Sequence, residues 1–284
     1  MGHLSLPDIT LVVLLGLAVG SFLNVLIARL PQMLERRWQR EALETAIEMG
    51  HVQPDLQLPS ASFNLFWPGS HCPHCQHPIA WYLNVPVLSY IMLRGKCRHC
   101  TQAIGWPYPL VEALTAIWFV TVAHLWGMGI TSACWALFGA VLIALTFIDV
   151  GHMLLPNELT QPLCWAGLLA SATGWIDVDV HSALWGAVVG YVLLWSVAQM
   201  YALIKKQQGM GQGDFKLLAA LGAWLGWQNL GLLVLLASIM GIAHGIIRQI
   251  RHPQADPHFP FGPSLCLAAG LLAVAGRGMA WTWF

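Results

Sequence analysis

Charged residues are scarce in this sequence. They make up 9% of the 284 residues, whereas apolar residues make up 57%, and an average soluble domain is about 25% charged. A chain of this size with so little charge cannot cover a water-facing surface, which argues against an ordinary soluble protein. The net charge is zero and no run of basic residues exceeds two, so no nucleic acid is expected as a partner.

Two sequence patterns of hydrolytic enzymes are also missing. The chain contains no HExxH pair, which would present two zinc-binding histidines on one helical face. It contains no GxSxG turn, which would expose a nucleophilic serine. Their absence disfavours an intramembrane metalloprotease and a serine hydrolase.

Long apolar segments are abundant. A bilayer core needs about 20 mostly apolar residues in helical form, and a backbone facing lipid must be satisfied within its own segment. The sequence therefore predicts an all-α polytopic membrane protein of about eight transmembrane helices. The predicted spans are 9–29, 108–127, 131–149, 160–176, 182–204, 215–229, 230–248 and 261–281.

Basic residues predict the orientation, because they concentrate in cytoplasmic loops. With the N-terminus outside, twelve of the thirteen Lys and Arg residues fall in inside loops, and Arg277 alone falls outside. Asp8 precedes the first apolar stretch and the arginines follow it, which is the reverse of a signal peptide. The first segment is therefore expected to be a retained helix.

The one long polar segment is residues 30–107, which this orientation places in the cytoplasm. The chain accordingly divides into a first transmembrane helix (1–29), a cytoplasmic domain (30–107) and a seven-helix membrane core (108–284). The cytoplasmic domain begins with MLERRWQREALETAIEMG. Its apolar residues have helical spacing, and we expect a surface helix near the membrane interface.

Four cysteines in this domain form two CxxC pairs, Cys72 with Cys75 and Cys97 with Cys100, and 21 residues separate the pairs. Two such pairs can surround one zinc ion with four thiolates, although this spacing is slightly longer than usual. A cytoplasmic location keeps thiols reduced, and four protein ligands leave no position for substrate. We therefore predict a small zinc-ribbon-like domain with structural zinc. Nearby histidines could replace a ligand, and a redox dithiol is the alternative.

Two aspartates lie where apolar segments end or begin. Asp149 ends the third span and Asp214 begins the sixth, and the topology places both at the cytoplasmic membrane border. Two carboxyl groups that share a site hold one proton between them. One can then take a proton from water while the other polarises a peptide carbonyl. This chemistry is peptide hydrolysis without a metal or a covalent intermediate.

The glycines around Asp214 are expected to shape this site. In GMGQGDFK, Gly211 and Gly213 permit backbone conformations and close approaches that a side chain would block, and Lys216 belongs to the same motif. A simpler interpretation is that Asp214 is only the N-cap of the following helix. That explanation is weaker for Asp149, because the helix dipole disfavours a carboxylate at a helix C-terminus.

Six motifs in order resemble the type IV prepilin peptidases, which are membrane aspartic proteases with a GxGD motif. They are GSFLNVLIARLP, CPHC with LRGKCRHC, YPLVEALTA, IDVGHMLLPNELT, GMGQGDFKLLAALGAWLG and FPFGPSLCLAAG. The resemblance covers residues 16 to 270. One departure is Asn157, where members of the family often carry Asp.

The resemblance implies an inner-membrane endopeptidase that cuts the basic leader from prepilins or pseudopilins of type IV pilus or type II secretion systems. It implies Asp149 and Asp214 as the catalytic pair and Cys72, Cys75, Cys97 and Cys100 as zinc ligands. It also implies N-methylation of the new N-terminus with S-adenosylmethionine. No glycine-rich nucleotide-binding pattern supports that second activity, and Gly95 with Lys96 is explained equally well by a plain turn.

Three alternatives remain open at this point. A peptidase without methyltransferase activity differs only in its product. A transporter would also place carboxylates at helix ends, and replacement of Asp214 would then abolish transport. A structural scaffold would tolerate replacement of either aspartate. The sequence does not indicate the oligomeric state.

Overall fold

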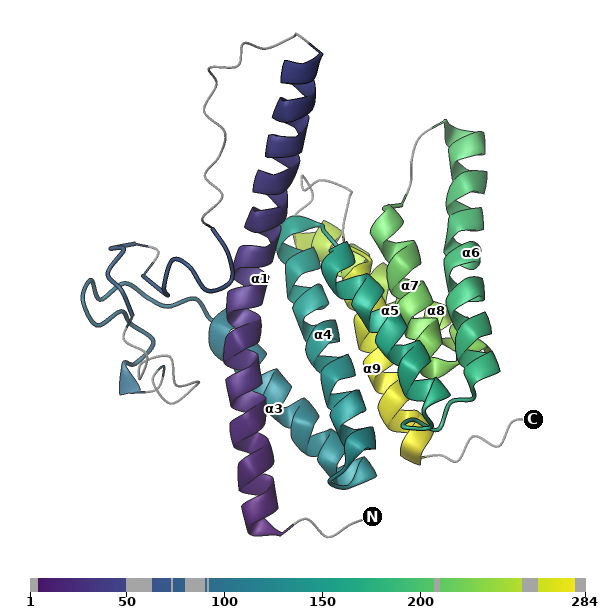
Figure 1. Ribbon diagram of the computed structural model, residues 1–284, viewed down its shortest axis with the longest axis horizontal. Helices are drawn as coiled ribbons and strands as arrows, with labels where there is room; N and C mark the ends of the chain where they lie inside the picture. The colour runs from purple at the N-terminus through teal and green to yellow at the C-terminus, as the bar shows by residue number, and fades with distance from the viewer. Residues whose placement is uncertain are drawn as a thin grey trace. The chain divides into compact units, whose positions relative to one another are not determined.

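The computed structural model describes residues 5–49, 63–72, 74–79, 90, 92–206, 210–251 and 260–278. Within these ranges the chain forms eight α-helices and one short 3-10 helix, and its only β-pairing is two isolated bridges. The eight predicted helices are therefore all present, and the all-helical fold class is confirmed (Figure 1). Their bounds are α1 Leu6–Glu48, α3 Pro107–Trp126, α4 Ile130–His152, α5 Asn157–Ala172, α6 Val180–Lys205, α7 Gln212–Leu225, η2 Trp227–Asn229, α8 Leu230–Arg251 and α9 Gly262–Gly278.

Not every helix is long enough to cross a bilayer. Among the described residues, α1, α3, α4, α6 and the segment of η2 with α8 are long and apolar enough to span, and α9 is a shorter apolar helix. The two shortest α-helices are α5, with 16 residues, and α7, with 14. A span needs about 20 residues, so the count of eight helices is confirmed without establishing eight spans.

The short helix α7 is at the centre of its part of the protein. Eleven of its 14 residues are buried, and it packs against α5, α6 and α9. A helix that is apolar on every side is a buried helix. Because α7 is covered by other helices rather than by lipid, it does not need the full bilayer length.

Small residues permit the close packing of α6 on α7. A Cβ atom added to Gly186 of α6 would collide with the backbone carbonyl of Gly222 in α7, and the reverse holds for Gly222. One turn further along α6, a Cβ on Gly190 would lie 2.7 Å from the Leu218 carbonyl oxygen. Gly186 and Gly190 form a GxxxG pattern, which lets the backbones of membrane helices approach closely.

An aromatic cluster packs beside this contact. Trp224 of α7 is almost completely buried, and its Nε1 donates a 2.8 Å hydrogen bond to the Leu163 carbonyl oxygen of α5. Its ring lies against Phe138 and Trp135 of α4. The indole N–H therefore has a partner in an otherwise apolar environment, which is the usual condition for burying Trp.

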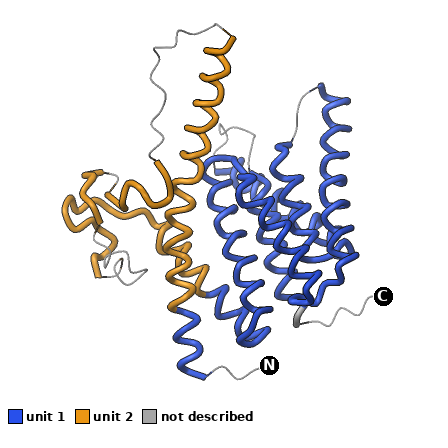
Figure 2. The backbone as a smooth tube through the Cα atoms, viewed as in Figure 1, with its two compact units in different colours: residues 1–13, 117–284 blue, residues 14–116 orange. Residues whose placement is uncertain are grey.

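The chain divides into two compact units, coloured separately in Figure 2. One comprises residues 1–13 and 117–284, and the other comprises residues 14–116. The first contains helices α4 to α9, and the aspartate motifs predicted from the sequence lie in it. The second contains most of α1, the start of α3 and all four cysteines of the CxxC pairs.

In the second unit, α1 crosses the beginning of α3 closely. A Cβ on Gly20 would lie 2.7 Å from the Cα of Glu112. Asn24 donates hydrogen bonds from Nδ2 to the Tyr108 carbonyl oxygen at 3.0 Å and to Glu112 Oε1 at 3.4 Å. Glu112 is buried, so its hydrogen bond with Asn24 is a polar contact between two apolar helices.

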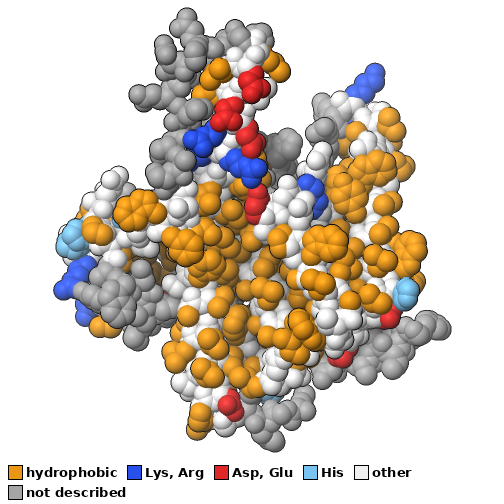
Figure 3. Space-filling model, in the orientation of Figure 1, with side chains coloured by type: hydrophobic (Ala, Val, Ile, Leu, Met, Phe, Trp, Pro, Cys, Tyr) orange, Lys and Arg blue, Asp and Glu red, His pale blue; other side chains and the backbone are white. Residues whose placement is uncertain are grey.

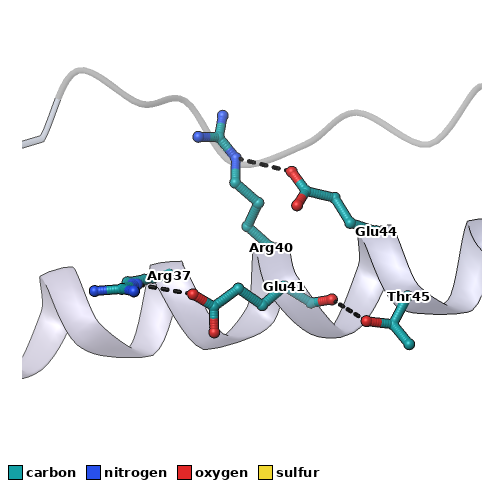
Figure 4. Close-up of polar contacts among 5 residues, drawn as sticks. All are labelled: Arg37, Arg40, Glu41, Glu44 and Thr45. Atoms are coloured by element: carbon teal, nitrogen blue, oxygen red, sulfur yellow. Dashed lines mark hydrogen bonds and ion pairs between the residues drawn. The ribbon is translucent and has the colours of Figure 1, made fainter.

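Helix α1 extends beyond the boundary predicted at residue 29. It continues to Glu48 with Pro31 inside it, so the predicted surface helix is the second half of one long helix. Leu, Glu, Arg, Gln and Ala favour helix formation in that half. Ion pairs four residues apart add support, namely Arg37 Nε to Glu41 Oε1 at 2.8 Å and Arg40 to Glu44 at 3.9 Å (Figure 4).

Hydrophobic side chains cover much of the helical surface. Figure 3 shows them spread over the visible face, with one group of charged side chains in the upper part of the view and a few others near the edges. Helix α6 illustrates the pattern, because most of its apolar side chains are exposed, including Trp185, Val192, Trp195 and Leu203. A monomeric soluble protein rarely exposes apolar surface on this scale, so these faces fit contact with lipid.

Candidate active site

Asp149 is in the last turn of α4, as the sequence predicts. The helix ends at His152, and Met153 follows in the left-handed conformation with φ of 50°. The Met153 N–H closes the helix on the Asp149 carbonyl oxygen at 2.9 Å. The Asp149 side chain is only 4% exposed, and its Oδ2 accepts a 3.1 Å hydrogen bond from the Gly262 N–H of α9.

Asp214 is in the first turn of α7, and its side chain is 9% exposed. The N-cap of this helix is Gly211, whose carbonyl oxygen accepts a 3.3 Å hydrogen bond from the Asp214 N–H. The interpretation of Asp214 as the N-cap is therefore wrong. The residue belongs to the helix itself, and burial of its carboxyl group needs another explanation.

The fold brings the two aspartates together. The two residues are 65 positions apart in sequence yet belong to the same compact unit. Leu155 lies against both Gly262, whose N–H donates to Asp149, and Gly213, which precedes Asp214. Two buried carboxyl groups at one place cannot both ionise without a large cost, so the pair is suited to sharing a proton.

Of the two motif glycines, Gly213 is in a crowded position. A Cβ on Gly213 would lie 2.8 Å from the Cβ of Leu155, which belongs to the segment between α4 and α5. Gly211 is different, since its φ of −72° suits any residue and a Cβ there would meet Asp214 Oδ2 at an ordinary 3.8 Å. Close packing against Leu155 thus explains the glycine at position 213 but not the one at position 211.

Lys216 joins the start of α7 to the start of α5. Its Nζ donates a 2.8 Å hydrogen bond to Oδ1 of Asn157, the first residue of α5. Asn157 is the position where the family often carries Asp, and here the amide oxygen accepts the bond that a carboxylate would accept.

Two further acids lie near the predicted membrane border. Glu158 is exposed, and Asp256 lies outside the described residues.

Two residues of this site were not predicted from the sequence, namely Gly262 and Leu155. Gly262 donates to Asp149, and Leu155 lies between Gly262 and Gly213. The Gly-Pro pair at the start of the last apolar segment indicates a helix start. It gives no sign that the first N–H of that helix meets a carboxylate 113 residues earlier.

The four cysteines of the other unit form a compact cluster. Their Sγ atoms all lie within 4.8 Å of one another, and those of Cys72 and Cys100 are 3.8 Å apart. Zinc bound tetrahedrally at about 2.3 Å places its sulfur ligands about 3.8 Å apart. The group found among the described residues contains these four cysteines and no histidine, so the donor set fits a closed zinc site.

The two CxxC loops repeat one backbone arrangement. The Cys72 N–H donates to the His77 carbonyl oxygen at 3.0 Å, and the Cys97 N–H donates to that of Gln102 at 2.8 Å. Gln76 and Thr101 hold equivalent left-handed conformations with φ of 55° and 57°. In both loops the left-handed residue comes four positions after the first cysteine, and the residue whose carbonyl oxygen accepts from that cysteine comes five positions after it. The two loops therefore form a local repeat that the sequence analysis did not identify.

The backbone of each loop favours the thiolate form of the first cysteine in that loop. The N–H groups of Cys100 and His99 point to the Cys97 sulfur and lower the pKa of that thiol to about 6. The N–H groups of Cys75 and His74 lower the pKa of Cys72 in the same way. Thiolate is the form that binds metal.

Gly95, with φ of 67°, forms the turn before the second loop, which agrees with the plain-turn explanation of Gly95 and Lys96.

The fold and the sites define a class of protein, namely an all-helical protein with several helices able to span a membrane, a buried aspartate pair and a four-cysteine cluster. Comparison with known proteins specifies the family. Residues 14–126 match the family described as Bacterial Peptidase A24 N-terminal domain. Residues 136–246 match the Type IV leader peptidase family.

Similar proteins carry a common description. The chain is 46% identical over 270 residues to a prepilin leader peptidase/N-methyltransferase of Aeromonas hydrophila, covering 94% of this chain and 90% of the relative. It is 44% identical to that of Pseudomonas aeruginosa (strain PAO1), covering 93% and 89%. It is 41% identical to that of Neisseria gonorrhoeae, covering 94% and 90%. No solved structure matches the chain.

This chain belongs to the type IV leader peptidase family. The membership confirms the resemblance seen in the sequence motifs.

Proposed function

We propose that this protein is an aspartic endopeptidase of the bacterial inner membrane that removes the basic leader peptide of type IV prepilins or pseudopilins. The observation that supports it most strongly is the buried pair of Asp149 and Asp214 in one compact unit. The names of the relatives, prepilin leader peptidase/N-methyltransferase, supply the substrate class.

The substrate fits the predicted topology. A prepilin has a basic leader in the cytoplasm joined to an apolar helix, so its cleaved bond would lie at the inner membrane border. With the N-terminus outside, the end of α4 and the start of α7 lie at that same border. The domain with the four cysteines would then be cytoplasmic, where its thiols remain reduced.

The proposed reaction needs one ionised and one protonated carboxyl group. The ionised group takes a proton from water, and the water oxygen attacks the carbonyl carbon of the scissile peptide bond. The protonated group gives its proton to the carbonyl oxygen, so no free oxyanion forms. When the carbon–nitrogen bond breaks, the first carboxyl group passes its proton to the leaving amine and the second recovers its proton. The sum is one water consumed, and both carboxyl groups regain their starting forms.

Zinc has a structural role in this proposal. Cys72, Cys75, Cys97 and Cys100 would hold the ion, whose positive charge would offset part of the charge of the four thiolates and so keep the two loops together. Four protein ligands leave no position for a substrate. The cytoplasmic domain, rather than the hydrolytic step, depends on it.

The second proposed activity is methylation of the new N-terminal amine. Bound S-adenosylmethionine would supply the methyl group. This proposal rests on the names of the relatives, and no residue of the described structure is assigned to hold the cofactor. A peptidase without methyltransferase activity remains the alternative. Mass spectrometry of the cleaved pilin decides between them, because only the bifunctional enzyme adds the mass of a methyl group.

The hydrolytic function is tested by cleavage of a prepilin in membranes that contain the full-length protein. Asp214→Asn removes a carboxylic acid with almost no change in shape, and we expect no cleavage by a variant that still inserts and accumulates. Glu158→Gln is the matched control, because Glu158 is an exposed acid in the first turn of α5. Full cleavage by Asp214→Asn would disprove the two-carboxylate mechanism.

A further inference from the structure

Gly262 is the first residue of α9 and has a backbone N–H to donate outside its helix. The residue before it, Phe261, has a carbonyl oxygen that accepts hydrogen bonds from the N–H groups of Ser264 at 3.1 Å and Leu265 at 3.2 Å. The first N–H groups of any helix lack partners inside it. That of Gly262 donates to Asp149 Oδ2 at 3.1 Å, and the bond is buried.

Only glycine fits this position without a rearrangement. A Cβ atom on Gly262 would lie 2.5 Å from Asp149 Oδ2, 3.2 Å from its Cγ and 3.1 Å from Leu155 Cδ2. Real Cβ contacts are essentially never as short as the first of these. An alanine would therefore displace either the Asp149 carboxyl group or the start of α9.

Leu155 connects this contact to the other aspartate. Its side chain is buried and lies beside Gly262 at its Cδ2 end and beside Gly213 at its Cβ end, where a Cβ on Gly213 would be 2.8 Å away. Gly213 immediately precedes Asp214. One leucine side chain thus packs between the backbone that holds Asp149 and the backbone that carries Asp214.

We propose that Gly262 and Leu155 are positioning residues for the aspartate pair. The Gly262 N–H fixes one oxygen of Asp149 and so orients its carboxyl group. Leu155 acts as a spacer that sets the separation between the start of α9 and the start of α7. Neither residue supplies a reacting group, and the inference rests on the proposed peptidase function.

The proposal predicts a loss of turnover without a loss of substrate binding. A catalytic group displaced by about 1 Å can cost about a hundredfold in rate. We expect Gly262→Ala to lower kcat for prepilin cleavage by about a hundredfold and Leu155→Ala to lower it by about tenfold. In both variants KM should stay within about twofold of the wild-type value, because neither residue is expected to contact the leader peptide.

Two controls separate positioning from general damage to the fold. Gly276→Ala lies in the same helix α9, where an added Cβ has no neighbour within 4 Å, and should leave kcat unchanged. Leu155→Met conserves side-chain volume and should recover most of the activity that Leu155→Ala loses. All variants are measured as the full chain in membranes, with accumulation and thermal unfolding recorded alongside cleavage.

The outcomes distinguish this inference from the proposed function. If Asp214→Asn abolishes cleavage but Gly262→Ala and Leu155→Ala keep the wild-type kcat, the positioning roles are wrong and the peptidase proposal stands. The positioning roles are also wrong if KM rises while kcat is kept, or if Leu155→Met is as impaired as Leu155→Ala. If Asp214→Asn cleaves normally, the proposed function itself fails.

Discussion

The carboxylate of Asp149 accepts a 3.1 Å hydrogen bond from the N–H of Gly262, so the end of α4 is joined to the start of α9. The bond satisfies two needs at once. It gives a partner to an N–H at the beginning of a helix, and it holds a carboxyl group that lies unfavourably at the end of its own helix. Asp149 is therefore both a structural contact and a candidate catalytic residue.

The two roles of Asp149 can be separated by Asp149→Asn. The asparagine side chain keeps an oxygen that can accept the Gly262 N–H, so we expect near-normal accumulation and unfolding temperature. It cannot exchange a proton, so prepilin cleavage should fall below detection. Immunoblots of the precursor and the mature pilin measure this result. Normal cleavage by Asp149→Asn would reduce Asp149 to a structural contact.

The four-cysteine cluster should hold one zinc per chain. Replacing Cys72 with Ser removes a ligand, and we expect the purified protein to lose its zinc and the loop of residues 92–104 to become sensitive to protease, because a structural zinc site contributes directly to folding. Zinc content by elemental analysis and limited proteolysis in detergent provide the measurements. Cys134→Ser is the control, since Cys134 lies in α4, outside the cluster. Unchanged zinc content in Cys72→Ser would refute the assignment.

The close contact of α6 with α7 should be intolerant of larger side chains. Gly186→Leu places its side chain against the backbone of Gly222, and overpacking costs about 1–3 kcal/mol even where side chains can adjust. We expect a clearly lower unfolding temperature in detergent. Gly231→Ala in α8 should unfold like the wild type, because nothing lies within 4 Å of a Cβ there. Equal stability of Gly186→Leu would show that the two helices are less tightly packed than described.

Restoring the Asp that the family often carries at position 157 should change the stability of the protein only slightly. Asn157→Asp would convert the hydrogen bond from Lys216 Nζ into an ion pair. The contact is exposed, so the gain should be no more than about 1 kcal/mol and should shrink as salt is added. Unfolding temperatures at low and high salt measure it, and cleavage should not change. A large gain that persists in high salt would mean that the pair is more buried than the structure shows.

Much of the fold follows from the sequence because its signals are local. Apolar segments of sufficient length predicted all eight helices, and the CxxC pairs predicted the sulfur cluster, since each pair turns two thiolates toward one point. The length of α1 was harder to predict. The end of the apolar span at residue 29 and the change to mixed charge indicate a boundary there, but good helix formers and ion pairs such as Arg37 with Glu41 continue the helix through Pro31.

In the candidate site, the sequence identifies the two aspartates but not the residues that hold them in place. The positions of Asp149 and Asp214 at the ends of apolar segments identify them, because a carboxyl group beside an apolar span is costly. The contacts that hold them come from residues without any chemical signature of their own. Gly262 acts through its backbone N–H and its missing side chain, and Leu155 acts through its shape.

The sequence by itself determined the apolar helices, the two CxxC pairs and the two carboxyl groups, because composition and spacing are properties of neighbouring residues. Only the tertiary structure decided that the start of α9 meets Asp149, that Leu155 separates it from Gly213, and that α7 is enclosed by other helices. Those relationships depend on packing between segments that are distant along the chain. Such packing is specified by the combined fit of many side chains, and no short motif records it.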